Sequence, residues 1–116
     1  MTQAAREVRV SEVLTAPAEG GREFVEFTND SNEPVDLFGW ELVEVGGTQP
    51  QRHSFASTIV PPAGYRQIAL PSSFVLRNDG VVLELRDGSG EILDTVQVPA
   101  ARRGESWSRL PGGEWA

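Results

Sequence analysis

The sequence predicts an all-β fold, a β-sandwich or barrel of seven to nine mostly antiparallel strands. Three observations support this. The apolar and β-branched runs are short, and several alternate with polar residues as half-buried strands do. Turn-forming residues interrupt these runs at intervals of about ten positions. No window of helical length places its apolar residues at the spacing of an amphipathic helix.

The stretch from residue 23 to residue 42 predicts two strands joined by a turn. Its first half is rich in aromatic and β-branched residues, and four turn formers follow at residues 29–32. Pro34 excludes a helix because its ring fixes φ and removes a backbone donor. In the second half we expect Gly39 to form a bend or bulge. We expect Trp40 to fill the core between two sheets, with a ligand platform as the alternative.

The first strand candidate, residues 8–14, contains an interruption. Val8 and Val10 share one face, but Glu12 breaks the alternation and Val13 falls on the other face. A β-bulge near Ser11 would bury both halves. Residues 1–6 are expected to be a disordered or tag-like segment, and residues 7–116 to form the domain.

Later elements follow the same pattern of short runs and turns. We expect the Trp40 strand to continue to Val45, residues 48–54 to be a polar surface excursion, and Phe55 to return to the core. Asp87-Gly88-Ser89-Gly90 predicts a hairpin loop, because glycine readily adopts the positive φ that a bulged turn needs. The remaining expected units are a strand at 65–70, an apolar patch at 74–76, the two hairpin strands at 81–86 and 92–98, and a closing segment at 106–115.

Composition limits the function classes. The 116 residues suit one domain with a single core. The net charge of −7 argues against broad binding to phosphate backbones, which requires a positive field. The chain has no cysteine, so disulfides and thiolate metal sites are excluded. Its first six residues do not resemble a signal peptide, and no run approaches the ~18 apolar residues of a membrane span.

Six segments together resemble a known family. They read EFVEFTN, VDLFGWEL, IVPPAGY, LRNDGVVLELRDGSGEILDTV, GESWSR and GGEW, and the resemblance covers about residues 7–115. Their order and spacing are similar to the lamin tail domain family in its bacterial form. The resemblance implies an immunoglobulin-like β-sandwich. It matches Gly39 and Trp40 to the family's Gly-Trp, Asn78 and Gly80 to its Asn-rich turn, Asp87 and Asp94 to its late hairpin, and Gly104, Ser106 and Arg109 to its closing segment.

One position departs from the family pattern. Asp79 precedes Gly80, whereas members of the family commonly place the acidic residue after the glycine. A contact that depends on that aspartate is therefore not transferred to this chain.

The resemblance also implies a function class. The family is a non-catalytic interaction or targeting module, usually an accessory domain of a larger protein. In bacteria it often accompanies secreted or envelope-associated hydrolases and nucleases, which favours a secreted or cell-envelope location. The partner stays unspecified, and roles in the nuclear lamina are not transferred because fold does not fix function.

The residues themselves offer little chemistry, and we expect neither an enzyme nor a cofactor. His53 is the only histidine, and no nucleophile-elbow motif accompanies it. A zinc site with one histidine and no thiolate would be unusual. Asp79, Asp87 and Asp94 match no calcium-loop spacing, so we interpret the first two as turn residues.

Asp94 is expected to be structural. Strict alternation puts it on the same inward face as Ile92, Val96 and Val98. A buried carboxylate needs hydrogen-bond partners. We expect backbone amides or a side chain from residues 106–109 to supply them, which would fix the closing segment to the sandwich. A ligand role is the alternative.

Two further functions stay open. Arg102, Arg103, Trp107 and Arg109 have the composition of a nucleic-acid or polyanion contact, although nearby glutamates and the acidic net charge oppose it. Weak self-association through unprotected sheet edges is the other alternative.

Overall fold

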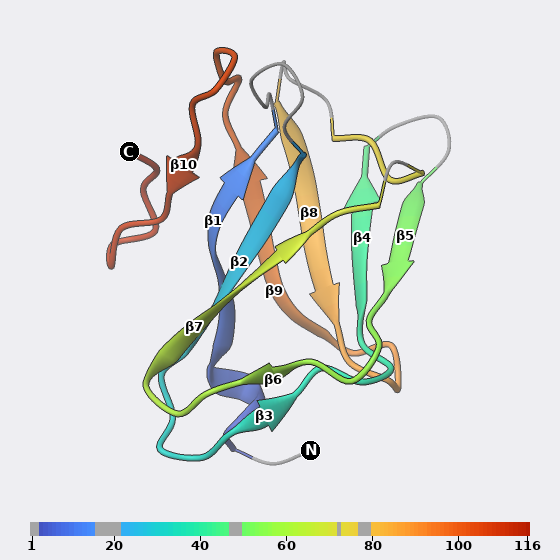
Figure 1. Ribbon diagram of the computed structural model, residues 1–116, viewed down its shortest axis with the longest axis vertical. Coiled ribbons are helices and arrows are strands. Elements are labelled where there is room, and N and C mark those ends of the chain that lie inside the picture. The colour runs from blue at the N-terminus through green and yellow to red at the C-terminus, as the bar shows by residue number, and fades with distance from the viewer. Residues whose placement is uncertain (1–2, 16–21, 47–49, 72, 77–79) are drawn as a thin grey trace.

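The computed structural model describes residues 3–15, 22–46, 50–71, 73–76 and 80–116 (Figure 1). This part of the chain contains ten strands and one 3-10 helix, η1 (Ala5–Glu7). Three strands have only two residues, which explains why the count exceeds the predicted seven to nine. The strands are β1 (Val8–Leu14), β2 (Phe24–Asn29), β3 (Val35–Asp36), β4 (Glu41–Val45), β5 (Gln51–Ser54), β6 (Ile59–Val60), β7 (Gly64–Ala69), β8 (Val81–Arg86), β9 (Ile92–Val98) and β10 (Trp107–Ser108).

The strands form two layers. One sheet has the order β10-β1-β2-β7 and the other the order β5-β4-β8-β9. All strand pairs in both sheets are antiparallel. The small pair β3-β6 lies across the lower end of the sandwich in Figure 1. This arrangement confirms the all-β sandwich.

The core lies between the two sheets. β2 and β8 alternate buried and half-buried residues over their whole length, as the period of two requires. The sheets contribute Phe27, Leu42 and Leu83, which have no exposed surface. Phe55, Phe74 and Leu76 close the same core from the connections between strands. Each such apolar side chain contributes about 1.5–3 kcal/mol on burial.

The predicted bulge in β1 is confirmed. The pairing of β1 with β2 shifts register between Val10 and Glu12, so Ser11 is the extra residue. Val8, Val10 and Val13 are all buried as a result. The bulge lets a strand with broken alternation present one apolar face to the core.

The β8–β9 hairpin forms where predicted, with one difference at its start. Gly90 has φ +89°, the conformation expected for this loop. The register shifts near the turn: Leu85 pairs with Asp94 and Arg86 with Ile92, so Leu93 is extra. Ile92 is consequently 49% exposed rather than inward-facing, and Leu93 packs partly against the core.

Two further expectations differ from the structure. The polar stretch predicted as a surface excursion contains β5, which pairs with β4 through its backbone although its sequence is QRHS. At the other end of the chain, residues 3–6 are not a separate disordered segment. Ala4 and Ala5 are buried and belong to the core.

Trp40 lies in the core, and Gly39 and Gly80 have positive φ angles. Trp40 is 7% exposed and packs in the core. Gly39 has φ +80°, within a turn in which the Trp40 N–H donates to the Leu37 carbonyl at 2.9 Å. Gly80 has φ +119°, which favours glycine. Asn78 and Asp79 lie outside the described residues.

Candidate interaction surfaces

Asp94 joins the two sheets and the closing segment. Its Oδ2 accepts hydrogen bonds from the Val10 N–H at 2.9 Å and from Arg109 Nη1 at 2.8 Å. The same Arg109 nitrogen donates to the Val10 carbonyl at 3.3 Å, and the Arg109 backbone N–H donates to the Ser11 carbonyl. The Asp94 side chain is only 9% exposed. The carboxylate therefore has the kind of partners expected from the sequence, including one from residues 106–109.

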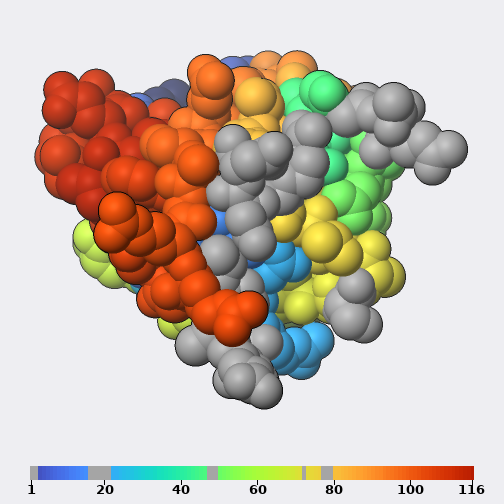
Figure 2. Space-filling model, turned by 90° about the horizontal axis from the view of Figure 1, so that it is seen from above, coloured from blue at the N-terminus to red at the C-terminus, as the bar shows by residue number. Residues whose placement is uncertain are grey.

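The four residues proposed for polyanion contact differ in their surroundings: two are engaged in contacts within the domain, and two are exposed. Arg109 is engaged with Asp94, and the Trp107 indole N–H donates to the Ala100 carbonyl at 3.1 Å. Trp107 also packs against the core. Arg102 and Arg103 are exposed in a turn that Gly104 closes with φ +81°. Figure 2 shows the segment from residue 101 onward, in orange to red, gathered on one side of the molecule.

His53 and Asp87, which were considered for catalysis or metal binding, contact neighbouring groups of the fold. The His53 ring lies edge-on to Phe55, with centroids 5.0 Å apart, and burial lowers its pKa. In the described residues its imidazole forms no hydrogen bond with a hydroxyl or carboxylate. Asp87 Oδ1 accepts bonds from the Ser89 side chain, the Ser89 N–H and the Glu91 N–H, which lower the pKa of Asp87 and shape its own turn.

No metal cluster or membrane span accompanies these residues. No group of three potential metal ligands occurs in the described ranges. No helix there is long and apolar enough to cross a membrane.

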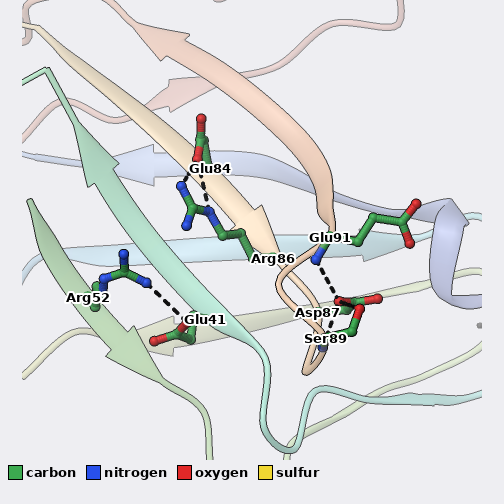
Figure 3. Close-up of polar contacts among 7 residues, drawn as sticks. All are labelled: Glu41, Arg52, Glu84, Arg86, Asp87, Ser89 and Glu91. Atoms are coloured by element: carbon green, nitrogen blue, oxygen red, sulfur yellow. Dashed lines mark hydrogen bonds and ion pairs between the residues drawn. The ribbon is translucent and has the colours of Figure 1, made fainter.

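The outer face of the sheet β5-β4-β8-β9 is covered by paired charges. Arg52 binds Glu41 at 3.5 Å, and Arg86 binds Glu84 (Figure 3). Val43 points to this face, between its cross-strand neighbours Arg52 and Glu84, yet it is only 1% exposed. Arginine stems commonly cover apolar surface in this way. Among the described residues, the charged side chains named here are paired, and Ile92, the cross-strand neighbour of Arg86, is the exposed apolar residue of this face.

β7 is an open sheet edge. It pairs with β2 over six residues without a register shift, and no strand in the described part of the chain pairs with its other side. The Leu70 N–H donates to the Glu23 carbonyl just beyond β7. Antiparallel bonding alternates along a strand, so Tyr65, Gln67 and Ala69 direct their backbone groups away from β2. Tyr65 is 64% exposed.

An acidic groove of about 550 Å³ lies at the end of the sandwich that carries β3. Its walls come from η1, the segment entering β3, Trp40 and the β8–β9 hairpin. The charged residues in its lining are Arg6, Glu33, Asp36, Asp87 and Glu91. Sequence reasoning missed this groove, because these residues are far apart in the chain and match no motif.

Comparison with protein families decides the identity of the fold. The family model described as Lamin Tail Domain matches residues 1–100. The chain belongs to the lamin tail domain family. Lamin tail domains are immunoglobulin-like, generally non-catalytic interaction domains, so the chain is an interaction domain of this fold. A search of curated proteins gave no match.

The family match is shorter than the resemblance predicted. It includes β1 to β9 of this lamin tail domain but not residues 101–116, which contain β10. The assignment of Gly104, Ser106 and Arg109 to the family's closing segment therefore has no support from the match. Arg109 nevertheless contacts the matched region through Asp94 and β1.

Proposed function

We propose that this lamin tail domain is an accessory module of a larger protein and binds an extended partner segment along β7. The observation that carries the proposal is the open edge of β7. Its six paired residues have no bulge, and three of them direct backbone donors and acceptors outward. A partner strand would add main-chain hydrogen bonds to the existing sheet.

The side chains of β7 indicate the chemistry of that segment. Tyr65 offers exposed aromatic surface next to the open edge. Arg66 is the only charged residue of the strand. A cross-strand pair of opposite charge contributes roughly 0.2–1 kcal/mol. The preferred segment therefore alternates apolar and polar residues and carries an acidic residue opposite Arg66.

Selection from a displayed random peptide library against the whole chain tests this proposal. The recovered peptides are expected to bind the natural chain and to lose about tenfold in affinity for Gln67→Pro. That substitution removes one outward N–H and leaves the β2 ladder in place. Gln67→Ala is the matched control, because it removes the side chain and keeps the N–H. Equal affinity for Gln67→Pro and Gln67→Ala would overturn the proposal.

A second copy of this chain is the alternative occupant of the β7 edge. A second copy of β7 would produce a dimer whose population rises with concentration and falls in Gln67→Pro. Light scattering across a concentration series distinguishes this outcome from peptide binding by a monomer.

The parent protein is proposed to be bacterial and secreted or attached to the cell envelope. The resemblance of the quoted motifs to bacterial lamin tail domains supports this. The reading frame around the gene provides the test. A neighbouring hydrolase or nuclease domain with an export signal is expected, and a cytoplasmic enzyme as neighbour would contradict the assignment.

A further inference from the structure

A groove of about 980 Å³, here called the outer-sheet groove, lies on the outer face of the sheet β10-β1-β2-β7. Arg9, Thr28 and Tyr65 line it and are direct cross-strand neighbours on β1, β2 and β7. They alternate along the first two strands with Val10 and Phe27, which are buried in the core. The row of three side chains therefore points away from the core. The volume of the groove is that of a site for a small molecule or a short piece of a polymer.

The turn that follows β10 forms one side of the outer-sheet groove. Residues 108–113 line it, and the pairing of β10 with β1 holds them beside the sheet (Figure 1). The Gly113 N–H donates to the Leu110 carbonyl and closes the turn. Leu110 is 43% exposed there, and Tyr65 is 64% exposed on β7. The groove therefore has an apolar side chain at one side, an aromatic ring at the other, and the polar outer face of β1 and β2 between them.

The bulge in β1 places a hydroxyl group in this groove. Ser11 is the extra residue of the bulge and lines the groove. Its Oγ donates to Glu26 Oε1 at 2.8 Å, and Glu26 lines the groove as well. The bond orients the carboxylate and leaves its other oxygen without a donor among the described residues. Bulges commonly redirect a side chain next to a functional site in this way.

The polar groups of the groove include both donors and acceptors that the fold does not use. The Arg9 guanidinium, the Tyr65 hydroxyl and the Asp30 carboxylate form no hydrogen bond or ion pair within the described part of the chain. The charged residues of the lining are two arginines, Arg9 and Arg109, and two carboxylates, Glu26 and Asp30. The lining is therefore formally neutral, although the chain carries a net charge of −7.

This combination selects the class of ligand. A peptide strand cannot extend the sheet here, because the backbone groups of β1 and β2 bond to neighbouring strands within the plane of the sheet. A phosphate backbone requires a positive surface, which a neutral lining does not provide. A sugar hydroxyl both donates and accepts, so it can bond to a guanidinium and to a carboxylate alike. The apolar face of a sugar ring can cover an exposed aromatic ring.

We propose that the outer-sheet groove binds a neutral oligosaccharide. One sugar ring lies against Tyr65, and hydroxyl groups of the chain of sugars bind Arg9 and the free oxygen of Glu26. Leu110 contacts the sugar at the other side of the groove. The inference goes beyond the β7 proposal, because it concerns the face of the sheet rather than its edge and another class of ligand.

Titration of the ¹⁵N-labelled whole chain with xylohexaose, cellohexaose and chitohexaose tests the inference by NMR. At least one of the three sugars is expected to bind with a Kd of about 1 mM or lower. The amide signals of Ser11, Thr28 and Tyr65 are expected to shift, and those of β4 and β8 to stay. No shift with any of the three sugars, or shifts confined to residues outside the groove, would overturn the inference.

Tyr65→Ala is expected to weaken the binding about tenfold, because it removes the ring that the sugar covers. Phe38→Ala is the matched control. It removes a ring that is 71% exposed and does not line the groove. The control is expected to change the affinity by about twofold at most. Equal losses in the two variants would contradict the assignment of the sugar to Tyr65.

Glu26→Gln tests the polar part of the site. It removes the charge and keeps an oxygen for the Ser11 hydroxyl. The affinity is expected to fall about fivefold without a lower melting temperature, because a hydrogen bond to a charged acceptor is stronger than one to a neutral acceptor. Glu105→Gln, which removes one charge outside the groove lining, is the control. If Glu26→Gln binds as the control does, Glu26 does not contact the sugar.

An anionic polymer is the competing class of ligand. Dextran sulfate is expected to leave the groove signals in place, because the lining is neutral and the whole chain is acidic. Larger shifts with dextran sulfate than with the neutral sugars would overturn the inference. Gln67→Pro alters the β7 edge but no residue of the groove lining, and it is expected to leave sugar binding unchanged. Failure at the β7 edge and failure at the groove are therefore separable.

Discussion

At the scale of single residues, the contact between Asp94 and Arg109 carries the largest expected effect. The two side chains are 9% and 21% exposed, and the bond between them is 2.8 Å long. Removing one partner of a nearly buried pair leaves the other charge without compensation. Arg109→Met is therefore expected to lower the free energy of unfolding by about 2 kcal/mol, measured by urea denaturation.

The matched control is an exposed pair on the outer face of the sheet β5-β4-β8-β9. Arg52 and Glu41 are 52% and 28% exposed. Arg52→Met is expected to cost less than about 0.5 kcal/mol, because water screens such a pair. If Arg109→Met costs no more than Arg52→Met, Asp94 does not stabilise the closing segment as argued.

Glu23 provides a residue-scale prediction about pH. Burial raises its pKa above 4.5, with a further increase from Glu44 and an opposing effect from the Leu76 N–H. A raised pKa means that the folded state binds the proton more tightly than the unfolded state. Stability is therefore lost as pH rises from 4.5 through the higher folded pKa.

Glu23→Gln removes this ionisation and keeps an oxygen for the Leu76 N–H. The variant is expected to melt at a higher temperature than the natural chain at about pH 7, and the gain is expected to disappear near pH 4. Thermal denaturation at the two pH values checks this. A difference of the same size at both would contradict the assignment to Glu23 ionisation.

At the scale of elements, the sequence predicted those features that a few neighbouring residues determine. The bulge in β1 was predictable because Glu12 interrupts an otherwise apolar alternation. The β8–β9 hairpin was predictable because residues 87–90 are rich in turn formers. β5 was not visible, since its QRHS sequence joins the sheet through backbone bonds to β4. The exposure of Ile92 depends on a bulge that strict alternation does not reveal.

The same difference between local and tertiary features applies to the candidate sites. The partner of Asp94 was predictable, because parity alone places a carboxylate on the inward face and demands hydrogen bonds for it. The acidic groove was not predictable, because it combines η1, β3 and a hairpin that only tertiary packing brings together.

The closing segment permits an element-scale prediction. Residues 101–116 lie outside the family match, but β10 pairs with β1, and Trp107 and Trp115 pack against the core. Deleting them is expected to lower the free energy of unfolding by about 3 kcal/mol or more, from apolar burial and the Arg109 contact together. Urea denaturation measures the change. Arg102→Ala/Arg103→Ala, which keeps the segment, is the control and is expected to be nearly neutral. If the deletion variant is as stable as this control, residues 101–116 do not stabilise the domain.

At the scale of the whole molecule, the two sides of the sandwich differ. On one side β9 lies beside β1, and Asp94 and Arg109 link the two sheets. On the other side β7 ends its sheet without a neighbour among the described strands. The acidic groove opens at one end. The contacts of the closed side stabilise the domain, whereas the open edge of β7 is the surface proposed for a partner segment.

Net charge argues against the last alternative, binding to nucleic acid. The chain carries −7, and of the four residues considered for this role only Arg102 and Arg103 are exposed without a described partner. Two cations neutralise about two phosphates, which gives a weak and strongly salt-dependent affinity at best. The repulsion of the remaining charge opposes even that. Fluorescence anisotropy with a short DNA duplex at about 50 mM salt is therefore expected to show no binding, for the natural chain and for Arg102→Glu/Arg103→Glu alike. Binding that disappears in this variant and at higher salt would instead identify the turn at Arg102 and Arg103 as a polyanion site.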